Sequence, residues 1–141
     1  AGFRIGGLAY LSDVVAVPAG TRAVLQAAPP LEVLVIDALR VSGTNSSHFS
    51  LEQALDEVRR LRPRVAYLVG LSHEFNYERT GAELRRRCAE DATLRGCDVR
   101  LAHDGLAFSF HASVQPVRAH TLHVKLSSLP AHIRKRHHAK A

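Results

Sequence analysis

The sequence Leu-Glu-Val-Leu-Val-Ile-Asp at residues 31–37 has five aliphatic residues, one interruption at Glu32, and a carboxylate at its end. A short apolar run of this kind is typical of a strand that is buried on both faces of a sheet. Similar runs occupy residues 9–11, 65–69 and 99–102, and Asp or His follows each of them within four residues. Because ligands of α/β proteins bind where strand ends open into loops, this repetition predicts the rim of a functional site.

Helical signals separate these runs. Ser50-Leu-Glu-Gln53 fits a capping box, apolar residues follow it at helical spacing, and Pro63 ends the pattern. Two more helices are predicted at residues 18–26 and 80–89. Alternation of helices with apolar strands predicts an α/β fold with one mixed sheet covered by flanking helices.

Two hairpins are predicted at the ends of this pattern. Gly6-Gly7 separates two short apolar strands at the start of the chain, and Asp104-Gly105 separates residues 99–102 from residues 106–110. Pairs of this composition are the strongest short-range signals for a hairpin turn.

The charge divides the 141 residues into two parts. Residues 1–110 contain all 13 acidic residues and an equal number of Lys and Arg, so they are neutral overall. Residues 111–141 carry the whole net charge of +6 and six of the nine histidines. We therefore predict one domain at 1–110 and a basic, His-rich, disordered tail at 111–141. We expect this tail either to be solvated or to bind polyanions. Because residues 1–110 are neutral overall, a basic nucleic-acid-binding domain is excluded.

Several classes of protein are disfavoured. No stretch approaches the roughly 20 apolar residues of a membrane span, and no signal peptide is recognisable at the start. Cys88 and Cys97 form neither a disulfide scaffold nor a zinc motif, so we expect free thiols in an intracellular, reducing compartment, with a Cys88–Cys97 disulfide as the alternative.

Three positions could carry chemistry near the strand ends. Asp13 is either a metal-binding carboxylate or a turn residue. His48 lies two residues before Ser50, at a helix start that suits a phosphate, and is either a phosphate ligand and proton donor or an exposed loop residue. His73 is either a metal ligand, oriented by Glu74, or a turn residue.

Taken together, these segments resemble the C-terminal half of a metallo-β-lactamase-fold hydrolase. The branch they resemble contains the cyclic ribose phosphodiesterase of phosphonate breakdown and lies near the tRNA 3′-processing endonucleases. The resemblance covers roughly residues 2–110. It depends on the motifs Ala9-Tyr10-Leu11-Ser12-Asp13, Val35-Ile36-Asp37-Ala38-Leu39-Arg40, His48-Phe49-Ser50, Leu71-Ser72-His73-Glu74-Phe75 and His103-Asp104-Gly105-Leu106.

The resemblance implies part of a four-layer αββα sandwich that holds two divalent metal ions, zinc or manganese. It assigns Asp13 as the carboxylate that bridges both metals. We expect His73 to be a further metal ligand that compensates for the family ligand missing at Gly70. It assigns His48, with Ser50, to the substrate phosphate, and makes His48 a proton donor to the leaving group. A metal-bridging water attacks phosphorus in that family.

The chain departs from the family pattern in two places. The signature His-x-His-x-Asp-His is absent, and Gly70 in Val69-Gly70-Leu71-Ser72-His73 replaces the first His of the bacterial Thr-His-x-Ser-His. We therefore expect the chain to be an incomplete portion of a metal-dependent phosphodiesterase whose substrate is a small phosphodiester or RNA. We expect this portion to be inactive on its own. The alternatives are a non-catalytic interaction module, which self-associates through an uncovered sheet face, and polyanion binding through the tail.

Overall fold

A computed structural model describes residues 2–27, 29–43 and 45–110. These residues form one five-stranded sheet and three helices, so the mixed α/β architecture predicted from the sequence is confirmed. The predicted disordered tail at 111–141 lies outside the described residues. Within the described part, no helix has the length and apolar character that crossing a bilayer requires.

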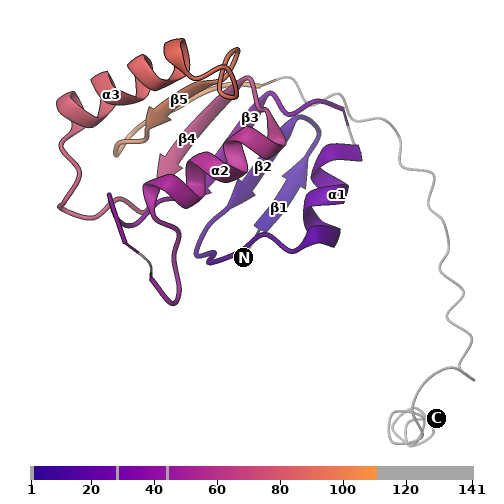
Figure 1. Cartoon of the computed structure of the whole chain (residues 1–141). Coiled ribbons are helices and arrows are strands. Elements are labelled where there is room, and N and C mark those ends of the chain that lie inside the picture. The colour runs from indigo at the N-terminus through magenta and orange to yellow at the C-terminus, as the bar shows by residue number, and fades with distance from the viewer. Residues whose placement is uncertain (1, 28, 44, 111–141) are drawn as a thin grey trace, which may run out of the picture.

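The sheet has the strand order β1-β2-β3-β4-β5, in which β1 is antiparallel to β2 and all other neighbours are parallel (Figure 1). The strands are β1 (Gly2–Ile5), β2 (Leu8–Leu11), β3 (Val33–Asp37), β4 (Val65–Val69) and β5 (Asp98–Leu101). The helices are α1 (Ala19–Ala27), α2 (Leu51–Leu61) and α3 (Tyr77–Glu90). The carboxyl ends of β2 to β5 consequently meet at one edge of the sheet, where the sequence placed its candidate residues.

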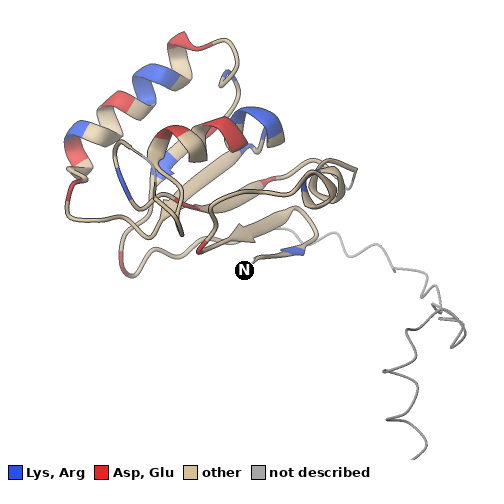
Figure 2. Cartoon of the chain, turned by 60° about the horizontal axis from the view of Figure 1, so that its bottom comes forward, with Lys and Arg blue, Asp and Glu red and all other residues tan. Residues whose placement is uncertain are grey.

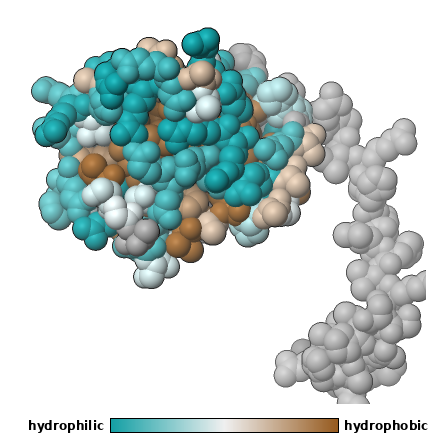
Figure 3. Space-filling view, viewed as in Figure 1, coloured by the Kyte–Doolittle hydropathy of each residue, from teal (hydrophilic) through white to brown (hydrophobic). Residues whose placement is uncertain are grey.

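All three helices cover the same face of the sheet, which we call the inner face. Leu25 of α1, Leu55 of α2 and Leu84 of α3 belong to one buried cluster that includes Leu34 and Ile36 of β3. Figure 3 shows this side of the molecule as mainly hydrophilic where α2 and α3 cover it. The hydrophobic effect of this cluster is the main stabilising contribution to the domain.

The opposite, outer face has no helix over it in the described residues. Its centre is a smaller cluster of Leu8, Val33 and Val35, against which Phe110 packs. The ring of Phe108 stacks on Tyr67, with 5.1 Å between ring centroids. At the β1 edge of the same face, apolar side chains remain exposed.

One predicted element is wrong. The Asp104-Gly105 turn forms, with Gly105 at a φ of +79° and the Leu106 N–H donating to the His103 carbonyl at 3.1 Å. Residues 106–110, however, are not a strand. They instead place their phenylalanines on the outer face, where burial of aromatic surface competes with edge pairing on β5.

The helix starts follow local capping chemistry. The predicted capping box is present, because the Gln53 N–H donates to Ser50 Oγ and the Ser50 N–H donates to Gln53 Oε1. Helix α3 begins at Tyr77, three residues before the predicted start, because Asn76 caps it by accepting the Arg79 N–H at 2.9 Å.

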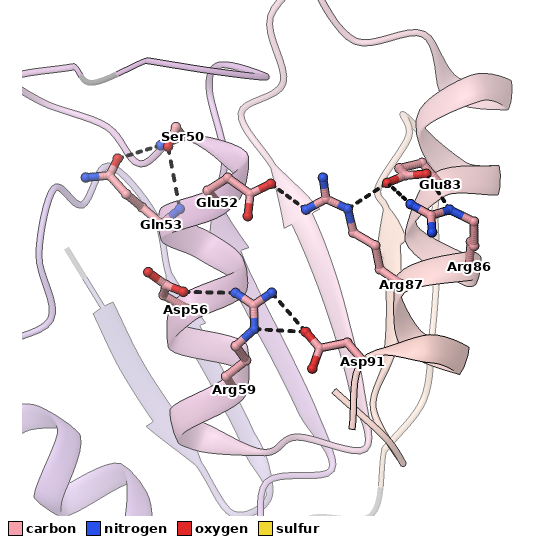
Figure 4. A network of polar contacts seen from close by, with 9 residues as sticks. All are labelled: Ser50, Glu52, Gln53, Asp56, Arg59, Glu83, Arg86, Arg87 and Asp91. Atoms are coloured by element: carbon pink, nitrogen blue, oxygen red, sulfur yellow. Dashed lines mark hydrogen bonds and ion pairs between the residues drawn. The ribbon is translucent and has the colours of Figure 1, made fainter. Parts of the chain in front are cut away.

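Charged residues concentrate on α2 and α3 (Figure 2), and hydrogen bonds between their side chains join the two helices. Arg87 of α3 donates both to Glu83 on its own helix and to Glu52 of α2, and Arg59 of α2 donates to Asp91 at the end of α3 (Figure 4). The arginine hydrogen bonds lower the pKa of Glu83 to about 2, and hydrogen bonds from Thr93, with a smaller contribution from Arg59, lower that of Asp91 to about 2.

These depressed pKa values predict acid sensitivity. A carboxylate with a lower pKa in the folded state stabilises the fold above its unfolded pKa, near 4, and that contribution disappears as the pH falls toward 2. We expect the free energy of unfolding, measured by urea denaturation, to fall between pH 4.5 and pH 2. The variant Glu83→Gln should show a shallower fall, and an unchanged slope would contradict the role of these ion pairs.

Candidate functional site

The buried carboxylate of Asp37 is the centre of the candidate site. Asp37 is the last residue of β3, and only 2% of its surface is exposed. Its Oδ2 accepts a hydrogen bond from His48 Nδ1 at 2.9 Å and another from the Phe49 N–H at 3.2 Å. Because a carboxylate only accepts, His48 Nδ1 must carry a proton, and Nε2 is the ring nitrogen left to meet a ligand.

The loop that carries His48 is held by backbone hydrogen bonds on both sides of the pair. The Leu39 N–H donates to the Phe49 carbonyl at 2.9 Å, and the Leu51 N–H donates to the Arg40 carbonyl at 2.8 Å. The segment after β3 and the segment before α2 therefore run side by side. This arrangement fixes the imidazole over the end of the strand rather than leaving it in a free loop.

Asp13 lies on the open side of the same histidine. It follows β2 by two residues, has a left-handed φ of +52°, and exposes 76% of its side chain. Its Oδ1 is 3.8 Å from His48 Nδ1. The structure thus brings together Asp13 and His48, two of the residues that the sequence analysis selected, with Asp37 beneath them.

Gly70 closes the site from the neighbouring strand. It follows β4 at a φ of +71°, and a Cβ placed on it would lie 2.7 Å from Asp37 Oδ1. Such an approach is closer than side-chain carbons tolerate, and the backbone conformation also disfavours any residue with a Cβ. A side chain at position 70 would therefore require the Asp37 carboxylate or the backbone to shift.

The remaining candidates lie differently. His73 is exposed on the loop after β4, and Glu74 binds Arg40 at 2.9 Å, which is the main cause of the lowered pKa of Glu74. Ser50 is buried, and its hydroxyl accepts from the first turn of α2. These hydrogen bonds assign Ser50 to the cap of α2 and Glu74 to Arg40.

We compared this donor set with the needs of a metal centre. A catalytic zinc generally takes three protein ligands and a water, and a pair of metals takes more. Among residues 2–27, 29–43 and 45–110, no group of three or more His, Cys, Asp or Glu side chains is arranged to hold a metal ion. The described residues therefore do not fit a dinuclear metal site on their own.

The sequence placed Asp37 at the predicted rim, at the end of a buried strand, but assigned it no role and did not predict its pairing with His48. The sequence does contain a signal for this pairing. Asp37 directly follows four aliphatic residues of a strand, and a carboxylate in that position requires a buried partner.

Comparison with known proteins finds a likeness among solved structures. No family model and no curated protein matches the chain. Among solved structures, a new diphosphatase from the PhnP family matches with a TM-score of 0.64 and 29% sequence identity, over 79% of this chain and 38% of that chain. The chain resembles part of a diphosphatase. It spans less than two fifths of that protein's length, which agrees with the partial metallo-β-lactamase-type fold expected from the sequence.

The contact between Gly70 and Asp37 predicts a specific energetic coupling. Gly70→Ala should destabilise the fold by about 1–3 kcal/mol, because it combines backbone strain with the collision. In an Asp37→Ala background, the collision disappears and part of that cost should be recovered, as a double-mutant cycle measured by urea unfolding would show.

Gly96 offers a matched control for this cycle. It also has a positive φ, of +87°, but a Cβ there would meet no atom within 4 Å. Gly96→Ala should therefore cost only the backbone strain and show no coupling to Asp37. Equal coupling for both glycines would refute the steric explanation of Gly70.

Proposed function

We propose that this chain supplies the phosphate-facing part of a phosphodiester hydrolase. The observation that carries the proposal is the buried Asp37 carboxylate that holds His48 at the carboxyl edge of the sheet, beside the exposed Asp13. The likeness to a PhnP-family diphosphatase supports a phosphodiesterase-like metallo-hydrolase at a coarse level.

His48 is the proposed general acid. With Nδ1 donating to Asp37, the ring presents Nε2 on its other side, and a proton carried there faces the substrate. When water attacks phosphorus and the bond to the leaving oxygen breaks, Nε2 gives its proton to that oxygen. Asp37 is a positioning residue, since it fixes the ring without touching the substrate.

The divalent metal of this class, zinc or manganese, needs ligands beyond the described residues. We propose that a segment with His-x-His-x-Asp-His, which this sequence lacks, supplies most of them and that Asp13 adds a carboxylate. His73 remains a proposed additional ligand. The chain is then inactive alone and becomes active only when that segment is present.

An activity assay tests this division of labour. The isolated chain should not hydrolyse bis(p-nitrophenyl) phosphate above the buffer rate with manganese or zinc. A chimera in which this chain replaces the matching region of the solved diphosphatase should hydrolyse it, and His48→Ala should lower its rate by about 10²–10⁴-fold. Glu90→Gln, at the far end of α3, is the control and should have no effect.

Two results would contradict the proposal. Turnover by the isolated chain that disappears in Asp13→Ala would show that the described residues form a complete site. A folded, active chimera whose rate does not depend on His48 would remove that residue from the reaction.

A second candidate function is an interaction module, which the outer face favours. Phe3 and Ile5 of β1 expose 52% and 50% of their surface there, and Phe3 stacks on Tyr10 with 5.2 Å between ring centroids. Clustered exposed apolar residues of this kind mark interaction sites. We propose that a further layer of protein, or a second copy of this chain, covers them.

Sedimentation velocity measures the self-association. We expect the isolated chain to form dimers or larger species at micromolar concentration, and Phe3→Ser with Ile5→Ser to shift it toward monomer because it removes apolar surface. Val24→Ser is the control, since Val24 is also exposed but lies on α1. A monomer at all concentrations would exclude self-association.

A further inference from the structure

A hollow lies next to the candidate site, between the ends of β4 and β5. Its volume is about 340 Å³, and it is lined by Gly70 and Leu71 after β4, by Tyr77 of α3, and by residues 102–104 after β5. This volume lies at the lower end of the range for small-molecule pockets. It is therefore large enough for one compact ligand and too small for a chain of nucleotides.

Tyr77 forms one wall of the hollow and is held in place. Its hydroxyl donates to the Ala102 carbonyl at 2.7 Å, which ties the first residue of α3 to the end of β5. Half of its surface nevertheless remains exposed. A fixed, exposed aromatic ring is a platform on which a flat ring of a ligand can stack at little entropic cost.

His103 and Asp104 provide the polar groups. His103 Nδ1 donates to the Asp104 carbonyl at 3.0 Å, because a carbonyl oxygen can only accept, so Nε2 remains available to a ligand. The Asp104 carboxylate is exposed beside it, at the turn that Gly105 completes. A carboxylate of this kind accepts hydrogen bonds from the hydroxyl groups of a sugar.

Gly70 connects the hollow to the candidate site. It lines the hollow, and a Cβ placed on it would lie 2.7 Å from Asp37 Oδ1, while Asp37 Oδ2 binds His48. The two places are therefore separated by one residue and one carboxylate. A substrate whose phosphate meets His48 would extend its esterified alcohol toward the hollow.

From this arrangement we propose that the hollow binds the alcohol half of the phosphodiester, and that this half is a single nucleoside. The inference rests on the proposed function of His48 and adds Tyr77, His103 and Asp104 as specificity-determining residues. The base stacks on Tyr77, the ribose hydroxyls donate to Asp104, and His103 Nε2 binds a polar group of the ligand. Among the described residues, no Lys or Arg lines the hollow, so a neutral nucleoside suits it better than a further phosphate group.

Binding of adenosine to the full ¹⁵N-labelled chain, followed by NMR, tests this inference without requiring catalysis. Adenosine should shift the amide signals of Tyr77 and residues 102–105. Tyr77→Ala should weaken adenosine binding about tenfold or more, because base stacking on an aromatic ring is lost. Tyr77→Phe should weaken it less, since it keeps the ring and removes only the bond to Ala102.

Two further arms separate this inference from the proposed function. Asp104→Asn should weaken binding of adenosine more than that of 2′,3′-dideoxyadenosine, which lacks the ribose hydroxyls, and Glu90→Gln should change neither. Inorganic phosphate, titrated separately, should shift the His48 ring signals. If phosphate shifts His48 while adenosine leaves the hollow unperturbed, the nucleoside inference is overturned and the proposed function stands. If adenosine binds the hollow and phosphate does not reach His48, the hollow is a nucleoside site and the proposed function fails.

Discussion

The burial of one carboxylate organises the functional edge of this domain. Asp37 is carried into the interior by an aliphatic strand, and a buried carboxylate without partners would be very unfavourable. The partners come from the loop before α2, through the His48 ring and the Phe49 N–H, which places that loop over the strand end. On the other side the carboxylate requires a residue without a Cβ, which Gly70 provides. The position of His48 and the identity of residue 70 thus have a common cause.

The position of the Asp37 carboxylate bears on Gly70, where the chain departs from the family pattern. From the sequence, Gly70 is simply a missing ligand. In the structure, a Cβ at this position would lie 2.7 Å from Asp37 Oδ1, so a side chain there requires the carboxylate or the backbone to shift. The edge is organised around a hydrogen-bonded aspartate–histidine pair, with Asp13 as an exposed carboxylate beside it. Among the described residues no group of three or more His, Cys, Asp or Glu side chains could hold a metal ion, and we propose that they serve the phosphate side of a hydrolase.

Sequence patterns predicted the sheet, the three helices and the capping box, because apolar periodicity and local capping are encoded by residues near one another. The failures concern contacts between distant residues. The closing strand at 106–110 is absent because its phenylalanines find Tyr67 across the outer face. The partner of His48 was missed because Asp37 lies eleven residues away, and only the fold brings them to 2.9 Å. Asp13 and His48 lie 3.8 Å apart in the structure, and the roles given to them from the sequence stay predictions.

The central claim is that Asp37 holds His48 with its proton on Nδ1 and leaves Nε2 for the substrate. The most direct test is the ¹⁵N NMR spectrum of the His48 ring at a pH where the ring is neutral. The account predicts a protonated Nδ1 and an unprotonated Nε2, and a loss of this preference in Asp37→Ala. A proton on Nε2 in the unaltered chain, or equal populations of the two neutral forms, would contradict it.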